Sequence, residues 1–148
     1  MGHKVTNDTK EEADKLSNLI IGAALEVHRA IGPGLLESTY EECLVHELRL
    51  RGLGLRRQVG VPLVYKGLHL DAGYRLDLFV EGLVIVEVKA VEHLLPVHEA
   101  QLLTYLRLTN LKLGLLINFG HRYVKNGIER VVNGLDDKGF GFKSPIKS

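Results

Sequence analysis

The strongest constraint on the fold of this chain comes from two apolar, β-branched segments. Both of them contain charged residues. Residues 83–88 have the composition of a fully buried strand, except that Glu87 lies within them. Lys89 follows two residues later, and alternate residues of a strand point to the same face, so Glu87 and Lys89 share a face. Asp77 lies within the preceding apolar segment, residues 74–80. We therefore expect two adjoining strands that carry three charged side chains into the interior.

These charged side chains have two chemical interpretations. A buried charge costs several kcal/mol unless it is paired, hydrogen-bonded or bound to a cation. Asp77 and Glu87 on adjacent strands could hold one hard divalent cation, with the Val88 backbone carbonyl as a further ligand. Lys89 could then orient a water or neutralise charge on a phosphate. The alternative is a buried ion pair of Lys89 with either carboxylate. Because such pairs add little net stability, three charges favour a functional site.

The loop between the two segments decides whether Asp77 can reach Glu87. In an antiparallel hairpin, residues that oppose each other share a face of the sheet. A two-residue loop would place Asp77 opposite Val86, which is the wrong face. We therefore predict a three-residue loop over residues 81–83, or a bulge, in which Gly82 adopts a positive φ.

Apolar periodicity predicts the remaining elements. Helices are predicted over about residues 9–30, 36–50 and 96–108. Strands are predicted over about residues 59–65, 74–80, 84–90 and 113–119, followed by a hairpin over 123–132 around Asn126-Gly127. Since a helix joins the strand at 84–90 to the strand at 113–119, these two strands should run parallel.

Three further polar residues lie on helix faces that could border the charged strands. Glu37 precedes Tyr40 by three residues, which places it on the buried side of the second helix. An acidic residue in a first turn is also explained by the helix dipole. Gln101 and Tyr105 are four residues apart, so they share a face of the third helix. On spacing alone, they would form its amphipathic rim.

Length and composition limit the class of protein. The 148 residues suit one domain, predicted to span 1–148 with an ordered core over about 9–134 and a flexible tail over about 136–148. The single cysteine, Cys43, excludes an internal disulfide and a multi-cysteine zinc site. A net charge of +1 gives no overall field for nucleic acid. The chain has no apolar run of transmembrane length and no signal-peptide core, so we expect a cytoplasmic protein without a membrane partner.

Several short motifs follow one another in a specific order. Residues 34–40 read G-x-x-E-x-x-Y, and Asp77, Glu87-Val88-Lys89 and the Q-x-x-x-Y run at 101–105 come after them. In this order the chain, over about residues 19–134, resembles the GxxExxY proteins, a family assigned to the PD-(D/E)XK nuclease-like superfamily. The resemblance implies an α/β fold with an α-β-β-β-α-β core, a mixed sheet flanked by helices, and a Mg²⁺ or Mn²⁺ site.

The resemblance also implies roles for individual residues. By this resemblance, Asp77 and Glu87 look like the metal-binding carboxylates, and Lys89 looks like the catalytic lysine. Residues that would support the site are Glu37, Gln101 and Tyr105. Glu37 resembles the extra helix carboxylate of part of the superfamily. Gln101 and Tyr105 match a helix motif that borders the site in several nuclease branches. Leu76 stands where the superfamily pattern has proline.

These patterns together lead to one functional expectation and two alternatives. We expect a metal-dependent nuclease that hydrolyses phosphodiester bonds in DNA or RNA, in which Asp77, Glu87, Lys89 and Glu37 are catalytic. The first alternative is a non-catalytic nucleic-acid-binding or protein-interaction module on the same fold, which the near-neutral charge would suit. The second is a homodimer whose buried charges serve only structure. Metal binding at Asp77 and Glu87 distinguishes the nuclease from both.

Overall fold

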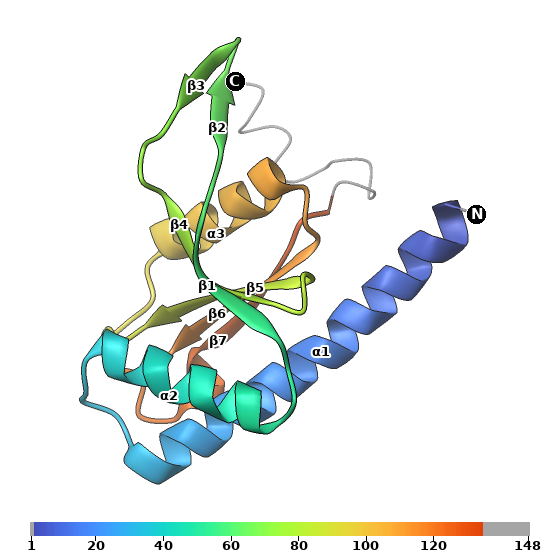
Figure 1. Cartoon of the computed structure of the whole chain (residues 1–148). Coiled ribbons are helices and arrows are strands. Elements are labelled where there is room, and N and C mark those ends of the chain that lie inside the picture. Colours follow the sequence, from blue (N-terminus) through green and yellow to red (C-terminus); the bar gives the residue numbers. More distant parts are fainter. Residues whose placement is uncertain (1, 135–148) are drawn as a thin grey trace.

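A five-stranded mixed sheet forms the centre of the molecule (Figure 1). The computed structural model describes residues 2–134, with side chains from residue 9 onward. The strands in spatial order are β1 (Leu55–Gly60), β4 (Arg75–Val80), β5 (Val84–Lys89), β6 (Leu113–Asn118) and β7 (Ile128–Val132). β5 and β6 run parallel as predicted, and the other neighbouring strands are antiparallel.

Helices cover both faces of this sheet (Figure 1). They are α1 (Gly2–Ile31), α2 (Glu37–Leu50) and α3 (Pro96–Thr109). Val84, Val86 and Val88 of β5 belong to the hydrophobic core under α1 and α2, whereas Ile85 belongs to the core under α3. Because both faces are covered, the whole of β6 is buried and most of β5 with it. The predicted α/β class, with a mixed sheet between helices, is confirmed.

Two predictions near the ends of the chain are wrong: the start of the first helix and the hairpin over residues 123–132. α1 begins at Gly2 rather than near residue 9, and no proline interrupts the segment between. The predicted hairpin over 123–132 does not form. Instead Val124–Gly127 makes a 3-10 turn (η1), and β7 pairs directly with β6. Gly127 is needed for close packing, because a Cβ there would lie 2.7 Å from the carbonyl oxygen of Asn118.

The segment predicted as one strand over 59–65 is divided in two. β1 ends at Gly60, Pro62 lies in the break, and β2 (Leu63–Tyr65) begins a separate two-stranded sheet with β3 (Leu68–Leu70). A tight Lys66-Gly67 turn, with φ of 47° and 85°, joins the two short strands. This β2–β3 hairpin projects away from the main sheet (Figure 1).

The predicted flexible tail over 136–148 lies outside the described residues. Among residues 2–134, no helix combines the length and the apolarity that a membrane span requires.

Candidate active site

The β4–β5 hairpin brings Asp77 and Glu87 together. Val80 pairs with Val84, so the loop between the strands has three residues, and Gly82 within it has a φ of 66°. The predicted three-residue loop is therefore confirmed. The backbone ladder of the hairpin stops one pair before Asp77 and Glu87 would face each other.

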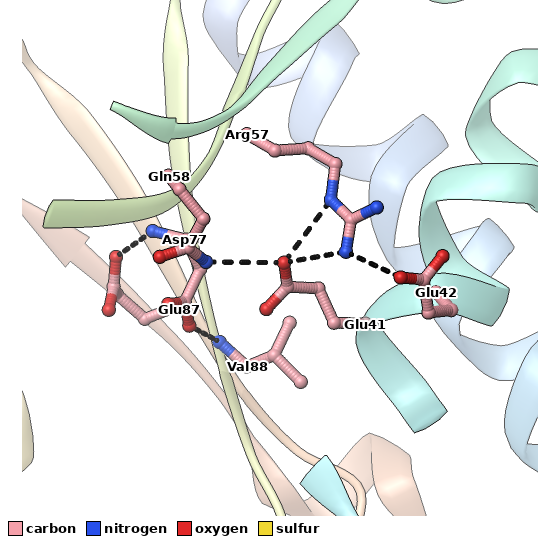
Figure 2. A network of polar contacts seen from close by, with 7 residues as sticks. All are labelled: Glu41, Glu42, Arg57, Gln58, Asp77, Glu87 and Val88. Atoms are coloured by element: carbon pink, nitrogen blue, oxygen red, sulfur yellow. Dashed lines mark hydrogen bonds and ion pairs between the residues drawn. The ribbon is translucent and has the colours of Figure 1, made fainter. Parts of the chain in front are cut away.

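Beyond that point, the side-chain carboxylates replace the backbone ladder (Figure 2). Glu87 Oε2 accepts a hydrogen bond from the N–H of Asp77 at 3.0 Å, and Asp77 Oδ2 accepts one from the N–H of Val88 at 2.8 Å. Asp77 Oδ1 and Glu87 Oε1 take no part in these bonds. Among the described side chains, neither oxygen is a buried atom without a partner, so both reach solvent. The two strands therefore hold each other's carboxylates and leave one oxygen of each open.

The sheet is also irregular on the other side of Asp77. Gln58 of β1 lies opposite Asp77 in register but forms no ladder pair with it, and its φ is 52°. Leu76 packs in the core under α3 while Leu78 packs in the core under α1 and α2, although residues two apart normally share a face. A non-glycine residue in the left-handed region costs on the order of 1 kcal/mol and such residues cluster at functional sites.

Burial, together with nearby negative charge, makes both carboxylates hard to ionise. Burial, followed by the negative charge of Asp77, raises the pKa of Glu87 to about 8. Burial also raises the pKa of Asp77 to about 6, although the hydrogen bond from the Val88 N–H lowers it. The pair therefore takes up protons more readily than two exposed carboxylates would.

Lys89 lies at the end of β5 on the same side as Glu87. It is half-buried, and its positive charge lowers the pKa of both carboxyl groups. Within residues 9–134, no ion pair of 4.0 Å or less joins Lys89 to Asp77 or Glu87. The buried ion pair considered as an alternative is therefore not formed, and the ammonium group remains available to another anion.

α2 brings a different carboxylate to the site than the sequence indicates. Glu37 was expected on the buried side of this helix, but it is exposed; as the first residue of α2 it lies beyond the covered part. Its charge still raises the pKa of Asp77. Glu41, one turn later, is only 8% exposed and its charge raises the pKa of both carboxyl groups. Its spacing of seven residues before the buried Leu48 could have identified it.

Glu41 is held in place by two residues of β1 (Figure 2). Its Oε2 accepts hydrogen bonds from Arg57 Nη2 at 3.1 Å and Nε at 3.3 Å, and from Gln58 Nε2 at 3.3 Å. Arg57 also pairs with Glu42 at 3.1 Å. The left-handed conformation of Gln58 thus belongs to a contact that fixes Glu41 beside the carboxylate pair.

α3 supplies one of its two expected residues. Tyr105 is buried in the core under α3, and burial followed by the charge of Glu87 raises the pKa of its hydroxyl. Gln101 is exposed. α3 therefore turns Tyr105 toward the interior and leaves Gln101 exposed to solvent.

The G-x-x-E-x-x-Y motif has a structural part. Gly34 has a φ of 99° in the turn before α2, a conformation that favours glycine. Tyr40 is fully buried; its hydroxyl donates to the carbonyl of Gly32, and its ring stacks on Phe119 with centroids 4.8 Å apart. The N–H of Phe119 in turn donates to the carbonyl of Lys89 at 2.8 Å. The tyrosine therefore fixes the start of α2 against the strand end that carries Lys89.

The donor set fits a hard divalent cation. Asp77 and Glu87 offer one open carboxylate oxygen each. The N–H and C=O of a strand residue point to the same side, so the Val88 carbonyl also faces β4. Among the described residues, no three His, Cys, Asp or Glu side chains gather as a metal cluster. An ion held here would complete its coordination with water, as Mg²⁺ usually does.

Comparison with known proteins adds one finding. A family model described as the PD-(D/E)XK nuclease superfamily matches residues 14–131, which is more than half of the chain and includes every site residue named above. No match was found among curated proteins or among solved structures.

We predict that the protein loses stability as pH rises from about 5 to about 8. Both carboxyl groups have pKa values raised above their ordinary range, so the folded state binds protons more tightly than the unfolded state. The stability that the folded protein gains from protonation of these two groups is fully present below about pH 4. It is lost as pH rises through about 6 and about 8. The free energy of unfolding, measured by urea denaturation in EDTA, should therefore fall steadily over this pH range.

The variant Glu87→Gln tests the origin of this pH dependence. Glutamine is uncharged and can still accept the Asp77 N–H, so the variant should be more stable than wild type at pH 8 and should show a flatter pH profile. Glu11→Gln, at an exposed position of α1, is the matched control and should follow wild type. A Glu87→Gln profile as steep as that of wild type would contradict the assignment.

Proposed function

This chain belongs to the PD-(D/E)XK nuclease superfamily, and on that premise we propose that it is a nuclease that hydrolyses phosphodiester bonds in DNA or RNA. Nucleases of this superfamily generally use divalent metal ions. The observation that supports the proposal is the reciprocal contact of Asp77 and Glu87, in which each carboxylate binds the backbone of the opposite strand through one oxygen and keeps its second oxygen outside that contact. The motif order further supports membership of the GxxExxY family and a single domain over residues 1–148.

We propose the following roles for the residues of this chain. Asp77 and Glu87, with the Val88 carbonyl, hold Mg²⁺ or Mn²⁺. When bound, the ion lowers the pKa of a water and stabilises charge on a phosphate oxygen. Lys89 positions the attacking water or the phosphate, because its ammonium group is not engaged by either carboxylate. The water oxygen forms a bond to phosphorus and gives up a proton to solvent, the opposite P–O ester bond breaks, and the leaving oxygen takes up a proton from solvent.

The surrounding residues would position this centre. Tyr105 is buried and Glu87 raises the pKa of its hydroxyl, so we assign it a role in limiting the access of water to Glu87. Glu41 and the exposed Glu37 add negative charge near Asp77, which favours the binding of a cation. Gln101 is exposed and is suited to contact the nucleic-acid backbone.

A second candidate function is a non-catalytic nucleic-acid-binding module on the same fold. It is favoured by the lack of a cluster of three metal-binding side chains among residues 9–134 and by the net charge of +1. Such a module has no need for a cation at Asp77 and Glu87, so metal binding separates the two candidates.

We predict that Mn²⁺ or Mg²⁺ raises the melting temperature of the wild-type protein at pH 8. A bound cation relieves the repulsion between Asp77 and Glu87 and stabilises the folded state by mass action, about 2.7 kcal/mol at one hundred times the dissociation constant. The shift should be smaller at pH 5, where protons compete for the same oxygens. Differential scanning fluorimetry over a metal series measures both effects.

Asp77→Asn should remove most of this metal-dependent shift, because the amide oxygen is a neutral and weaker ligand. Glu99→Gln, at an exposed position of α3, is the matched control and should keep the full shift. An equal metal-dependent shift in wild type and Asp77→Asn would place the cation elsewhere.

We further predict that Lys89→Ala slows cleavage far more than it weakens metal binding. Loss of a preorganised charge at a developing oxyanion typically lowers the rate by ~10²–10³. Single-turnover cleavage with Mn²⁺ on single- and double-stranded DNA and RNA measures the rate, and fluorimetry measures the metal-dependent shift.

The exposed Lys15 of α1 provides the control, since Lys15→Ala should cleave at the wild-type rate. A cleavage rate that Lys89→Ala leaves unchanged would show that the activity belongs to a contaminant. Binding of nucleic acid without cleavage by any variant would favour the non-catalytic module.

A further inference from the structure

A cavity of about 320 Å³ lies at the root of the β2–β3 hairpin, beside the start of β4. Its walls include Gly60, Val61 and Pro62 on the way into the hairpin and Leu70, Tyr74 and Arg75 on the way out. The division of the predicted strand at Pro62 therefore creates this cavity, because it turns β2 and β3 away from the main sheet. No residue of the proposed catalytic centre lines it.

The walls combine three kinds of chemistry. The ring of Tyr74 is 46% exposed, and Pro62 and Leu70 add apolar surface beside it. The guanidinium of Arg75 lies over Gly60, where a Cβ would be 3.6 Å from Nη1, so it supplies a cation at the cavity wall. Asp71 is exposed and supplies a hydrogen-bond acceptor. A flat aromatic face, a cation and an acceptor match the base, the phosphate and the amino groups of a nucleotide.

The cavity is linked to the proposed catalytic centre by Tyr74 and by the first residues of β4. The ring centroids of Tyr74 and Tyr105 are 6.3 Å apart with a tilt of 54°, and Tyr105 lies close enough to Glu87 for their charges to interact. Arg75 precedes Asp77 by two residues of β4, roughly 7 Å along the strand. A nucleotide in the cavity would therefore neighbour, on the same nucleic-acid strand, a phosphate at the carboxylate pair.

We propose that this cavity binds one unpaired nucleotide of the substrate next to the phosphate that is cleaved. Its base stacks on Tyr74, its phosphate pairs with Arg75, and Asp71 accepts an N–H from the edge of the base. A base inside a duplex is stacked and paired with its neighbours, so it cannot enter such a cavity unless it is flipped out. The inference rests on the proposed nuclease function and names its substrate class as single-stranded DNA or RNA.

Binding without cleavage tests the inference. Fluorescence anisotropy in EDTA measures the affinity for a labelled single-stranded DNA 15-mer, an RNA of the same sequence and the corresponding blunt duplex. Wild type should prefer the single strands. Tyr74→Ala should weaken single-strand binding about five- to hundredfold, which is the usual effect of losing one base-stacking aromatic. Tyr74→Phe should bind as wild type does, and the duplex affinity of Tyr74→Ala should be unchanged.

Further variants separate stacking from charge and from folding. Tyr123 is 56% exposed and also lies beside an arginine, Arg122, so Tyr123→Ala is a matched control that should bind single strands as wild type does. Arg75→Gln should lower the slope of log affinity against log salt by about 0.7, whereas Tyr74→Ala should leave that slope unchanged. Gly60→Val fills the cavity from another element and should weaken single-strand binding without changing the melting temperature measured by circular dichroism.

The outcomes distinguish this inference from the proposed function. Unchanged single-strand affinity in Tyr74→Ala, an equal loss in Tyr123→Ala, an equal loss on the duplex, or a wild type that does not bind single strands would overturn the nucleotide site. Any of these results together with Mn²⁺-dependent cleavage would remove this site and leave the nuclease intact. Single-strand binding that depends on Tyr74, with no cleavage by wild type, would keep the site and remove the nuclease.

Discussion

The reciprocal contact between Asp77 and Glu87 is the interaction on which the centre of this molecule depends. The ladder between β4 and β5 ends just before these residues, and buried N–H groups need acceptors. The two carboxylates supply them, each on the strand opposite its own. The same burial that makes these bonds strong makes both groups hard to ionise, which favours the uptake of a proton by the pair.

The layered fold decides which side chains can surround this pair. β5 is covered on both faces, so Glu87 is buried wherever its side chain points. α2 brings Glu41 from one face, and α3 brings Tyr105 from the other. Asp77 lies where the pleat of β4 is broken, which lets its carboxylate reach the backbone of β5 rather than one face of the sheet. The proposed catalytic centre therefore lies at an irregularity of the sheet, with a helix on either side.

The G-x-x-E-x-x-Y motif has a structural role next to the candidate site. In G-x-x-E-x-x-Y, the glycine turns the chain and Tyr40 fixes α2 through its hydroxyl and its stacked ring. Because Phe119 beneath that ring also binds the carbonyl of Lys89, the motif links the helix to the strand end that carries the lysine. The motif's own glutamate lies outside, and the next residue after the tyrosine, Glu41, faces inward. A single motif can thus position a site mainly by packing.

The sequence by itself determined the register of the β4–β5 hairpin. The parity of a hairpin loop is a local property, so it required three loop residues and set Asp77 level with Glu87. The break in the alternation of β4 around Asp77 did not follow from the sequence pattern. Only the tertiary structure decided the rest. The rotation of α2, which exposes Glu37 and buries Glu41, depends on contacts with distant strands, as does the left-handed turn at Gln58. Local patterns cannot specify these features, because their energies come from partners far away in the chain.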